Sequence, residues 1–249
     1  LCTLIKPTSG SILCNGKDIF ALDGEYRRIL GYLPQEFGFY PEFSVHDYLM
    51  YIASIKGMRT SIARKRVTEL LRQVGLAKMQ NRKMKKLSGG MKRRAGIAQA
   101  MLNNPKILIL DEPTAGLDPN ERIRFRNLIS ELSQDRLVLL STHIVSDIEY
   151  IANQVLLMKD GKISHSGTQE EIIQSVPVKV WSCVVANNEV EMWQKQFKVS
   201  NMKTLSDGIE LRILSEKSPH YNAKEETMTL EDIFLYYFGE KTGDDYDVL

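Results

Sequence analysis

The sequence predicts an α/β protein with a parallel sheet, an inserted all-helical block and a smaller C-terminal α+β region. Three short, continuously apolar runs, at 107–110, 137–140 and 155–158, alternate with segments of helical period. Strands that are apolar on both faces are typical of a parallel sheet covered by helices on both sides. Apolar residues also recur at helical spacing through about 44–86, and the pattern changes again after Pro177.

The N-terminal residues indicate short strands and turns. A turn over 7–10 leads into a strand over 11–14, and Asn15-Gly16 is a hairpin signal. A second strand is expected over 29–33, ahead of the helical block.

Pro177 is expected to mark the boundary between an N-terminal domain, 1–176, and a C-terminal accessory domain, 177–249. The accessory domain is expected to contain a polar, linker-like stretch over 215–226. The other expected elements are helices over 119–133 and 145–152, a hairpin turn at 159–162, a helix from 170, a strand over 178–185, a helix over 189–197, a strand over 209–214 and a helical apolar stripe over 230–238.

Composition excludes several protein classes. Of the 249 residues, 43% are hydrophobic and 26% charged, which excludes disordered and collagen-like chains. A net charge of +2 gives no overall reason to expect nucleic acid as a partner. The apolar runs are much shorter than the roughly 20 residues that span a bilayer. Cys2, Cys14 and Cys183 lack metal-ligand spacing, and this favours a reducing cytosolic compartment.

Charge is uneven along the chain. Residues 56–94 contain 14 Lys and Arg residues and one acid, Glu69. This cluster is either a solvated helical face or a surface that meets an anionic partner such as phosphate, lipid headgroups or an acidic protein. At the other end, Asp244, Asp245 and Asp247 form an acidic tail.

The apolar run 107–110 ends in the carboxylates Asp111 and Glu112, followed by Pro113. α/β sheets bind ligands at the carboxyl ends of their strands. There, one carboxylate can hold Mg²⁺ beside phosphates and the next can take a proton from water. The alternative is a strand that simply ends at charged residues.

A second candidate is Leu87–Met91, which precedes a helix with apolar residues at Ala95 and Ala98. Small residues at a helix N-terminus expose N–H groups that bind anions. The alternative is an ordinary serine N-cap followed by a glycine-rich turn.

These segments stand in a specific order with Gln35 upstream and Ser141-Thr142-His143 downstream. The whole set closely resembles the ATP-binding cassette family, the ATPase subunits of ABC transporters, over about residues 1–176. The matches are Gln35 to the Q-loop, 87–91 to the signature loop, 107–112 to the Walker B strand, 115–118 to the D-loop and His143 to the H-loop.

The resemblance implies a P-loop NTPase-like core with a helical subdomain over about 44–103. It also implies a site for ATP and Mg²⁺, with hydrolysis by in-line attack of water. By resemblance, Asp111 holds the metal shell, and the catalytic Gln35 contacts both the metal and the attacking water. Glu112 orients or deprotonates that water, and His143 bonds the γ-phosphate. Ser88, Gly89, Gly90 and Asp118 are the expected contacts to ATP across a head-to-tail dimer.

The implied partners are a second ABC ATPase subunit and separate transmembrane subunits, at the cytoplasmic face of the membrane and without nucleic acid. Two departures from the family matter. Met91 replaces a common Gln, as in exporters of the drug- and antibiotic-resistance type. No Walker A loop is found, because the segment from Gly10 to Lys17 lacks the required Ser or Thr. We expect that the chain begins after that loop and that residues 1–249 alone are inactive.

Two other functions stay open. One is a soluble ABC ATPase acting in translation or DNA repair, although such relatives usually carry two cassettes or long coiled coils. The other is a non-catalytic binding or regulatory module. In the accessory domain, Thr229–Phe234 resembles the C-terminal helix of the exporter branch.

Overall fold

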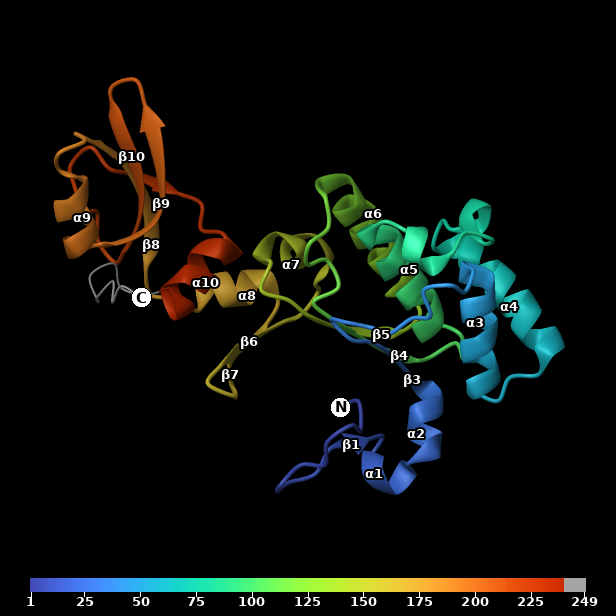
Figure 1. The fold of residues 1–249 in the computed structure, drawn as a ribbon. Helices are drawn as coiled ribbons and strands as arrows, with labels where there is room; N and C mark the ends of the chain where they lie inside the picture. Colours follow the sequence, from blue (N-terminus) through green and yellow to red (C-terminus); the bar gives the residue numbers. More distant parts are fainter. Residues whose placement is uncertain (240–249) are drawn as a thin grey trace, which may run out of the picture. The chain divides into compact units, whose positions relative to one another are not determined.

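The structure, a computed structural model, describes residues 1–239. The chain forms two compact units, Leu1–Ile144 and Val145–Leu249 (Figure 1). Residues 145–176 therefore pack with the C-terminal part of the chain. The domain boundary that the sequence predicts after residue 176 stays a prediction. The acidic tail at Asp244, Asp245 and Asp247 lies outside the described residues.

The first unit contains a parallel sheet in the order β3-β4-β5. Its strands are β3 (Leu30–Leu33), β4 (Ile107–Asp111) and β5 (Leu137–Ser141). Leu33 pairs with Leu110, and both side chains are fully buried. The prediction of a parallel sheet from these apolar runs is confirmed.

A hairpin precedes the sheet, as Asn15-Gly16 predicts. Its strands are β1 (Leu13–Cys14) and β2 (Lys17–Asp18), joined by Asn15 and Gly16 at positive φ. Two short helices that the sequence analysis did not predict follow, α1 (Ile19–Leu22) and α2 (Gly24–Ile29). Residue 29 therefore ends a helix, and β3 starts one residue later than expected.

The predicted helical block is present. It consists of α3 (Val45–Ile55), α4 (Thr60–Gln73), the short 3₁₀ turns η1 (Ala77–Met79) and η2 (Met84–Lys86), and α5 (Gly89–Ala100). In α3 and α4, buried residues recur at three- and four-residue spacing and form one apolar face. In α5, residues 94–98 are all buried, so this helix is covered on most of its surface there.

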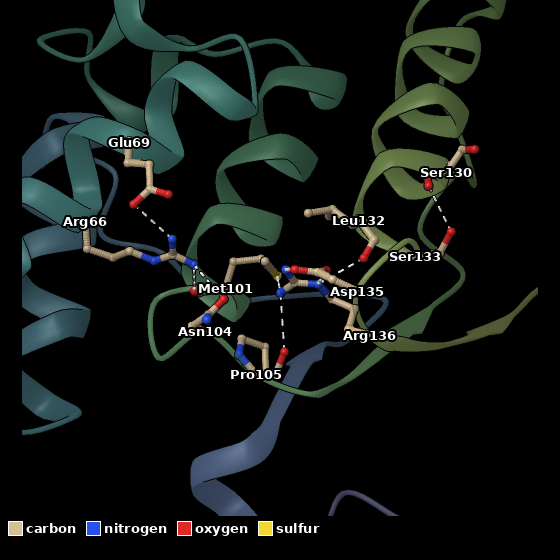
Figure 2. Close-up of polar contacts among 10 residues, drawn as sticks. All are labelled: Arg66, Glu69, Met101, Asn104, Pro105, Ser130, Leu132, Ser133, Asp135 and Arg136. Carbon is tan, nitrogen blue, oxygen red and sulfur yellow. Dashed lines mark hydrogen bonds and ion pairs between the residues drawn. The ribbon is translucent and has the colours of Figure 1, made fainter.

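Two arginines hold the loop that leaves α5 (Figure 2). Arg66 of α4 donates hydrogen bonds to Met101 O at 2.9 Å and Asn104 Oδ1 at 3.4 Å. Arg136 follows α6 (Pro119–Leu132) and donates to Pro105 O at 3.3 Å and to Leu132 O at 2.9 Å. The C-terminal end of α5 is thereby tied to the helical block and to α6.

Some side chains of the basic cluster at 56–94 form ion pairs with acids of the same unit. Lys83 and Lys85 both form ion pairs with Glu42, which lies outside that range. These two ammonium groups lower the pKa of Glu42 to about 2. Arg66 pairs with Glu69. The cluster is thus less strongly charged as a surface than the sequence alone suggests.

The second unit starts with α7 (Val145–Ile151) and a hairpin of β6 (Val155–Lys159) and β7 (Lys162–Gly167), followed by α8 (Gln169–Gln174). The prediction that 155–158 adds a third strand to the parallel sheet is wrong. β6 pairs antiparallel with β7, because Asp160 and Gly161 adopt the positive φ angles of a tight hairpin turn.

An antiparallel sheet in the order β11-β8-β10-β9 completes the second unit. The predicted strands are present as β8 (Lys179–Val185) and β10 (Gly208–Ser215), and the predicted helix as α9 (Val190–Gln196). The edge strands β9 (Lys198–Leu205) and β11 (Lys224–Glu226) were not predicted, because both are polar. Part of the expected linker is therefore a strand.

The last described helix, α10 (Leu230–Phe238), starts at a capping box made by Thr229 and Asp232. Asp232 is 2% exposed and accepts hydrogen bonds from Arg212 and Ser200 of the sheet. Burial alone would raise the pKa of Asp232, but the hydrogen bonds from Arg212, Thr229 and Ser200 outweigh it and lower the pKa. One carboxylate thus joins the helix N-terminus to the sheet.

We expect Asp232→Asn to lower the free energy of unfolding of the second unit by about 2–3 kcal/mol, since Arg212 loses its buried anionic partner. Because the folded pKa lies below the unfolded one, the contribution of Asp232 is present at neutral pH. It is lost as the pH falls through the folded value. Denaturant titrations between pH 3 and pH 7 measure this.

Glu231→Gln is the matched control, because Glu231 lies next to Asp232 and is exposed. It should change stability by less than about 0.5 kcal/mol. The difference between wild type and Asp232→Asn should shrink below about pH 4, near the ordinary pKa of Asp. A difference that stays constant through this range contradicts the assignment.

Candidate functional site

Two strands end side by side at the candidate site. Asp111 is the last residue of β4 and pairs in register with Ser141, the last residue of β5. Ser141 Oγ donates a hydrogen bond to Asp111 Oδ1 at 2.5 Å. Gln35 is exposed and lies two residues beyond the end of β3. Parallel pairing therefore places residues from all three strands at one edge of the sheet.

Glu112 leaves the strand with an unusual backbone, at a φ of 43°. Its N–H donates to Ser141 O at 3.0 Å, and this bond continues the pairing of β4 with β5. Its side chain, 18% exposed, approaches His143, with Oε1 2.8 Å from His143 Nδ1 and accepting from His143 N at 3.2 Å. Sequence reasoning named both residues but could not show that they are paired.

The other carboxylate oxygen, Glu112 Oε2, is buried and has no hydrogen-bond partner within residues 1–239. Buried acceptors are normally satisfied, so this oxygen is suited to receive a hydrogen bond from a water molecule. His143 restrains one oxygen, and the other is buried without a partner in the described chain. This arrangement fits a general base.

The donor set at this edge fits Mg²⁺ bound together with phosphates. Mg²⁺ is usually held by one or two carboxylates, with water and phosphate oxygens completing its shell. Asp111 supplies a carboxylate and Gln35 an amide oxygen from neighbouring strands. No cluster of three His, Cys, Asp or Glu residues occurs in the described chain, so a site made by protein ligands alone is not indicated.

The segment 87–91 has the geometry of a helix N-terminus. Ser88 is the N-cap of α5, and its Oγ accepts a hydrogen bond from Met91 N at 3.2 Å. Ser88 therefore does act as an ordinary serine N-cap. The capping role leaves the exposed backbone at Gly89 available to an anion, since α5 extends over 12 residues behind it.

Glu121 is a residue that the sequence analysis missed. Its side chain is 11% exposed and forms ion pairs with Arg94 of α5 at 3.2 Å and Arg124 at 2.8 Å. A Cβ added to Gly90 would lie 2.4 Å from Glu121 Oε2. Gly90 is therefore needed for the close approach of α5 and α6. The sequence signal for Glu121 is an acid three residues after the helix N-cap Asp118; its burial and its pairing with Arg94 are visible only in the structure.

Asp118 also has a structural role, as the N-cap of α6, where it accepts a hydrogen bond from Glu121 N at 3.0 Å. The structure thus brings Asp111, Glu112 and His143 together, with Gln35 in the loop that follows the adjacent strand β3. Ser88, Gly89, Gly90 and Asp118 form a second group near the junction of α5 and α6. Among the described residues, no hydrogen bond connects the two groups.

Comparisons with known proteins identify relatives of this chain. The family model for ABC transporters matches residues 1–115. The chain is 37% identical over 196 residues to the ABC transporter ATP-binding protein YxlF of Bacillus subtilis, covering 79% of this chain and 64% of that protein. It is 31% identical over 170 residues to the linearmycin resistance ATP-binding protein LnrL of the same species, covering 68% and 55%.

A solved structure, cbiO1 of Clostridium perfringens, described as part of the ABC transporter complex cbiONQ, is 28% identical. It superposes with a TM-score of 0.61 over 69% of this chain and 71% of that one. The chain spans 64% of the length of YxlF and 55% of the length of LnrL.

The contact between Gly90 and Glu121 leads to a stability prediction. Gly90→Ala should lower the free energy of unfolding by about 1–3 kcal/mol, because Glu121 cannot move without breaking its two arginine ion pairs. Thermal and denaturant unfolding measure this change.

Gly89→Ala is the matched control, since a Cβ at Gly89 meets no atom within 4 Å. We expect it to change stability by at most about 0.5 kcal/mol. Equal losses for the two variants would show that helix initiation, and not the contact with Glu121, requires glycine here.

Proposed function

Because the chain belongs to the ATP-binding cassette family of ABC transporters, we propose that it provides the ATP-hydrolysing site of a transporter. In this proposal, ATP drives the closure of a dimer of cassettes, and closure is coupled to export through separate membrane subunits. The observation that carries the proposal is the group at the carboxyl edge of the sheet. There, Glu112 is oriented by His143 beside Asp111.

Glu112 is the general base of the proposed reaction. Its Oε2 accepts a proton from the water that attacks the γ-phosphate, while Oε1 stays hydrogen-bonded to His143 N. Positioning and charge carry most of such a reaction, because little covalent chemistry is left to the protein. The buried, restrained carboxylate supports this role.

Asp111 and Gln35 would hold Mg²⁺ on the two neighbouring strands. When bound, this ion neutralises phosphate charge. Ser141 restrains Asp111 through its hydroxyl, so that one carboxylate oxygen is directed by the protein and the other faces the ligand. His143 is 69% exposed, which allows its ring to contact the γ-phosphate as well as Glu112.

Ser88, Gly89 and Gly90 are proposed to contact the ATP of a second cassette, together with Asp118. The exposure of Ser88 and Gly89 at the N-terminus of α5 supports this assignment, and Asp118 is the exposed N-cap of the neighbouring helix α6. The second subunit is either identical to this one or a related ATPase.

Export is the proposed direction of transport. One relative is described as a linearmycin resistance protein, and Met91 replaces the common Gln of the signature loop. No helix within residues 1–239 is both long and apolar enough to cross a membrane. Separate membrane-spanning subunits and a place at the cytoplasmic face of the membrane are proposed because the family resemblance implies them.

The first test is Glu112→Gln in a protein that contains this chain together with a phosphate-binding loop. Gln keeps the shape but accepts no proton, so kcat should fall by about 10²–10⁴-fold while ATP still binds. Steady-state ATPase assays and nucleotide retention on a spin column measure the two effects. Glu131→Gln, an exposed change on α6, is the control. Turnover within about threefold of wild type assigns the base to another residue.

A second test uses residues 1–249 alone. Most of the ground-state affinity for a triphosphate comes from backbone donors and a Lys of a phosphate loop, and we find no Walker A pattern in these residues. Calorimetry should therefore detect no saturable MgATP binding below about 1 mM. Micromolar affinity would show that these residues hold a phosphate site that we have not identified.

A further inference from the structure

The loop that carries Gln35 rests on α5, the helix that begins at the signature loop. Arg93 of α5 donates a hydrogen bond from Nη1 to Pro34 O at 3.3 Å, and the same nitrogen donates to Gln35 O. Pro34 and Gln35 directly follow β3. One guanidinium therefore binds two successive backbone carbonyls at the start of this loop.

Further contacts hold the rest of the loop against the same helix. The Lys92 ammonium lies 5.2 Å from the centre of the Phe39 ring. A Cβ added to Gly96 would lie 2.6 Å from Leu33 Cδ1 and 3.0 Å from Phe37 Cε1. The backbone of α5 therefore comes close to both ends of the loop.

Tyr48 of α3 closes the far end of the loop. Its hydroxyl lies 3.2 Å from Gly38 O and also within hydrogen-bonding distance of Gln99 Oε1 of α5, and its single proton is shared between these two acceptors. Burial raises the pKa of Tyr48 to about 12, so the hydroxyl stays protonated at physiological pH. The loop between Pro34 and Gly38 is thus attached to α5 at its start directly and at its end through Tyr48.

Contacts with neighbouring elements brace α5 near both of its ends. Its C-terminal end is tied by Arg66 and Arg136 (Figure 2), and Arg94 binds Glu121 of α6 near its N-terminal end. A displacement of the signature loop is therefore passed along a braced helix instead of being absorbed by bending.

From these contacts we propose that Arg93 is a positioning residue, which sets the place of Gln35 at the catalytic edge according to the position of the signature helix. Arg93 does not touch the reacting atoms; it acts through the backbone of Pro34 and Gln35. When the signature loop engages the ATP of a second subunit, α5 moves Gln35 with it. The inference rests on the proposed ATPase function and assigns to it a residue that the five family motifs do not include.

Electrostatics is consistent with this role. Burial lowers the pKa of Arg93, while the carboxylates of Glu36 and Asp111 act in the opposite direction. The guanidinium is thus partly desolvated and interacts with the carboxylate that ends β4. Arginine suits such a position, because its planar donor group reaches more than one acceptor and keeps its charge when buried.

The test compares Arg93→Met and Arg93→Lys with Arg72→Met, in a protein that contains this chain and a phosphate-binding loop. Met keeps an unbranched side chain but has no donor, and Lys keeps one cationic donor. Arg72 is an exposed arginine of α4 and controls for the loss of a surface charge. ATPase kinetics, thermal unfolding and amide hydrogen exchange over residues 35–38 are measured for each variant.

We expect Arg93→Met to lower kcat by about tenfold and to change KM for ATP by less than about twofold, since misplacement affects turnover more than binding. Arg93→Lys should fall between Met and wild type. Exchange at residues 35–38 should become at least about fivefold faster in Arg93→Met and stay unchanged in Arg72→Met.

Three results would overturn the proposal. These are a kcat of Arg93→Met within about twofold of wild type, unchanged exchange at 35–38, or faster exchange throughout the first unit with lower thermal stability, which indicates a merely structural role. A wild-type protein that hydrolyses no ATP would instead contradict the proposed function. Exchange at 35–38 would then still decide whether Arg93 restrains the loop.

Discussion

The parallel register of β3, β4 and β5 is the constraint on which the site depends. Leu33 pairs with Leu110, and Asp111 pairs with Ser141, so the ends of the strands coincide at one edge. A shift of one residue would turn alternate side chains to the other face of the sheet and separate Asp111 from Ser141. The buried leucines oppose such a shift, because it would expose apolar surface. The strand register therefore determines both the packing of the core and the geometry of the candidate site.

α5 connects this edge to the second group of candidate residues. At its N-terminus it carries Ser88 and Gly90, and one turn later Arg93 and Arg94 point to different elements, the loop after β3 and α6. Buried ion pairs such as Arg94 with Glu121 contribute little net stability compared with apolar packing. Here the ion pair restricts the relative position of α5 and α6, because the two charged groups are satisfied in few relative orientations. We infer that this helix is built to transmit position.

The second unit shows why local pattern can mislead about pairing. The run at 155–158 is as apolar as the runs at 107–110 and 137–140, yet Leu156 and Met158 are 53% and 62% exposed in β6. Among the described residues β6 pairs only with β7, across the predicted tight turn at Asp160-Gly161. At the end of the unit, Asp232 forms a capping box with Thr229 at the start of α10 and binds Arg212.

The sequence by itself determined the parallel strands, the hairpin at Asn15-Gly16, the helical block and the chemical identity of Asp111, Glu112 and His143. These follow from local periodicity, turn chemistry and motif spacing, which depend on residues close together in the chain. Only the tertiary structure decided that His143 holds one oxygen of Glu112, that Gly90 makes room for Glu121, and that Arg93 binds the loop at Gln35. Arg93 and Gln35 lie 58 residues apart in sequence. Such contacts depend on where packed elements direct their side chains, and one sequence contains no local signal for that direction.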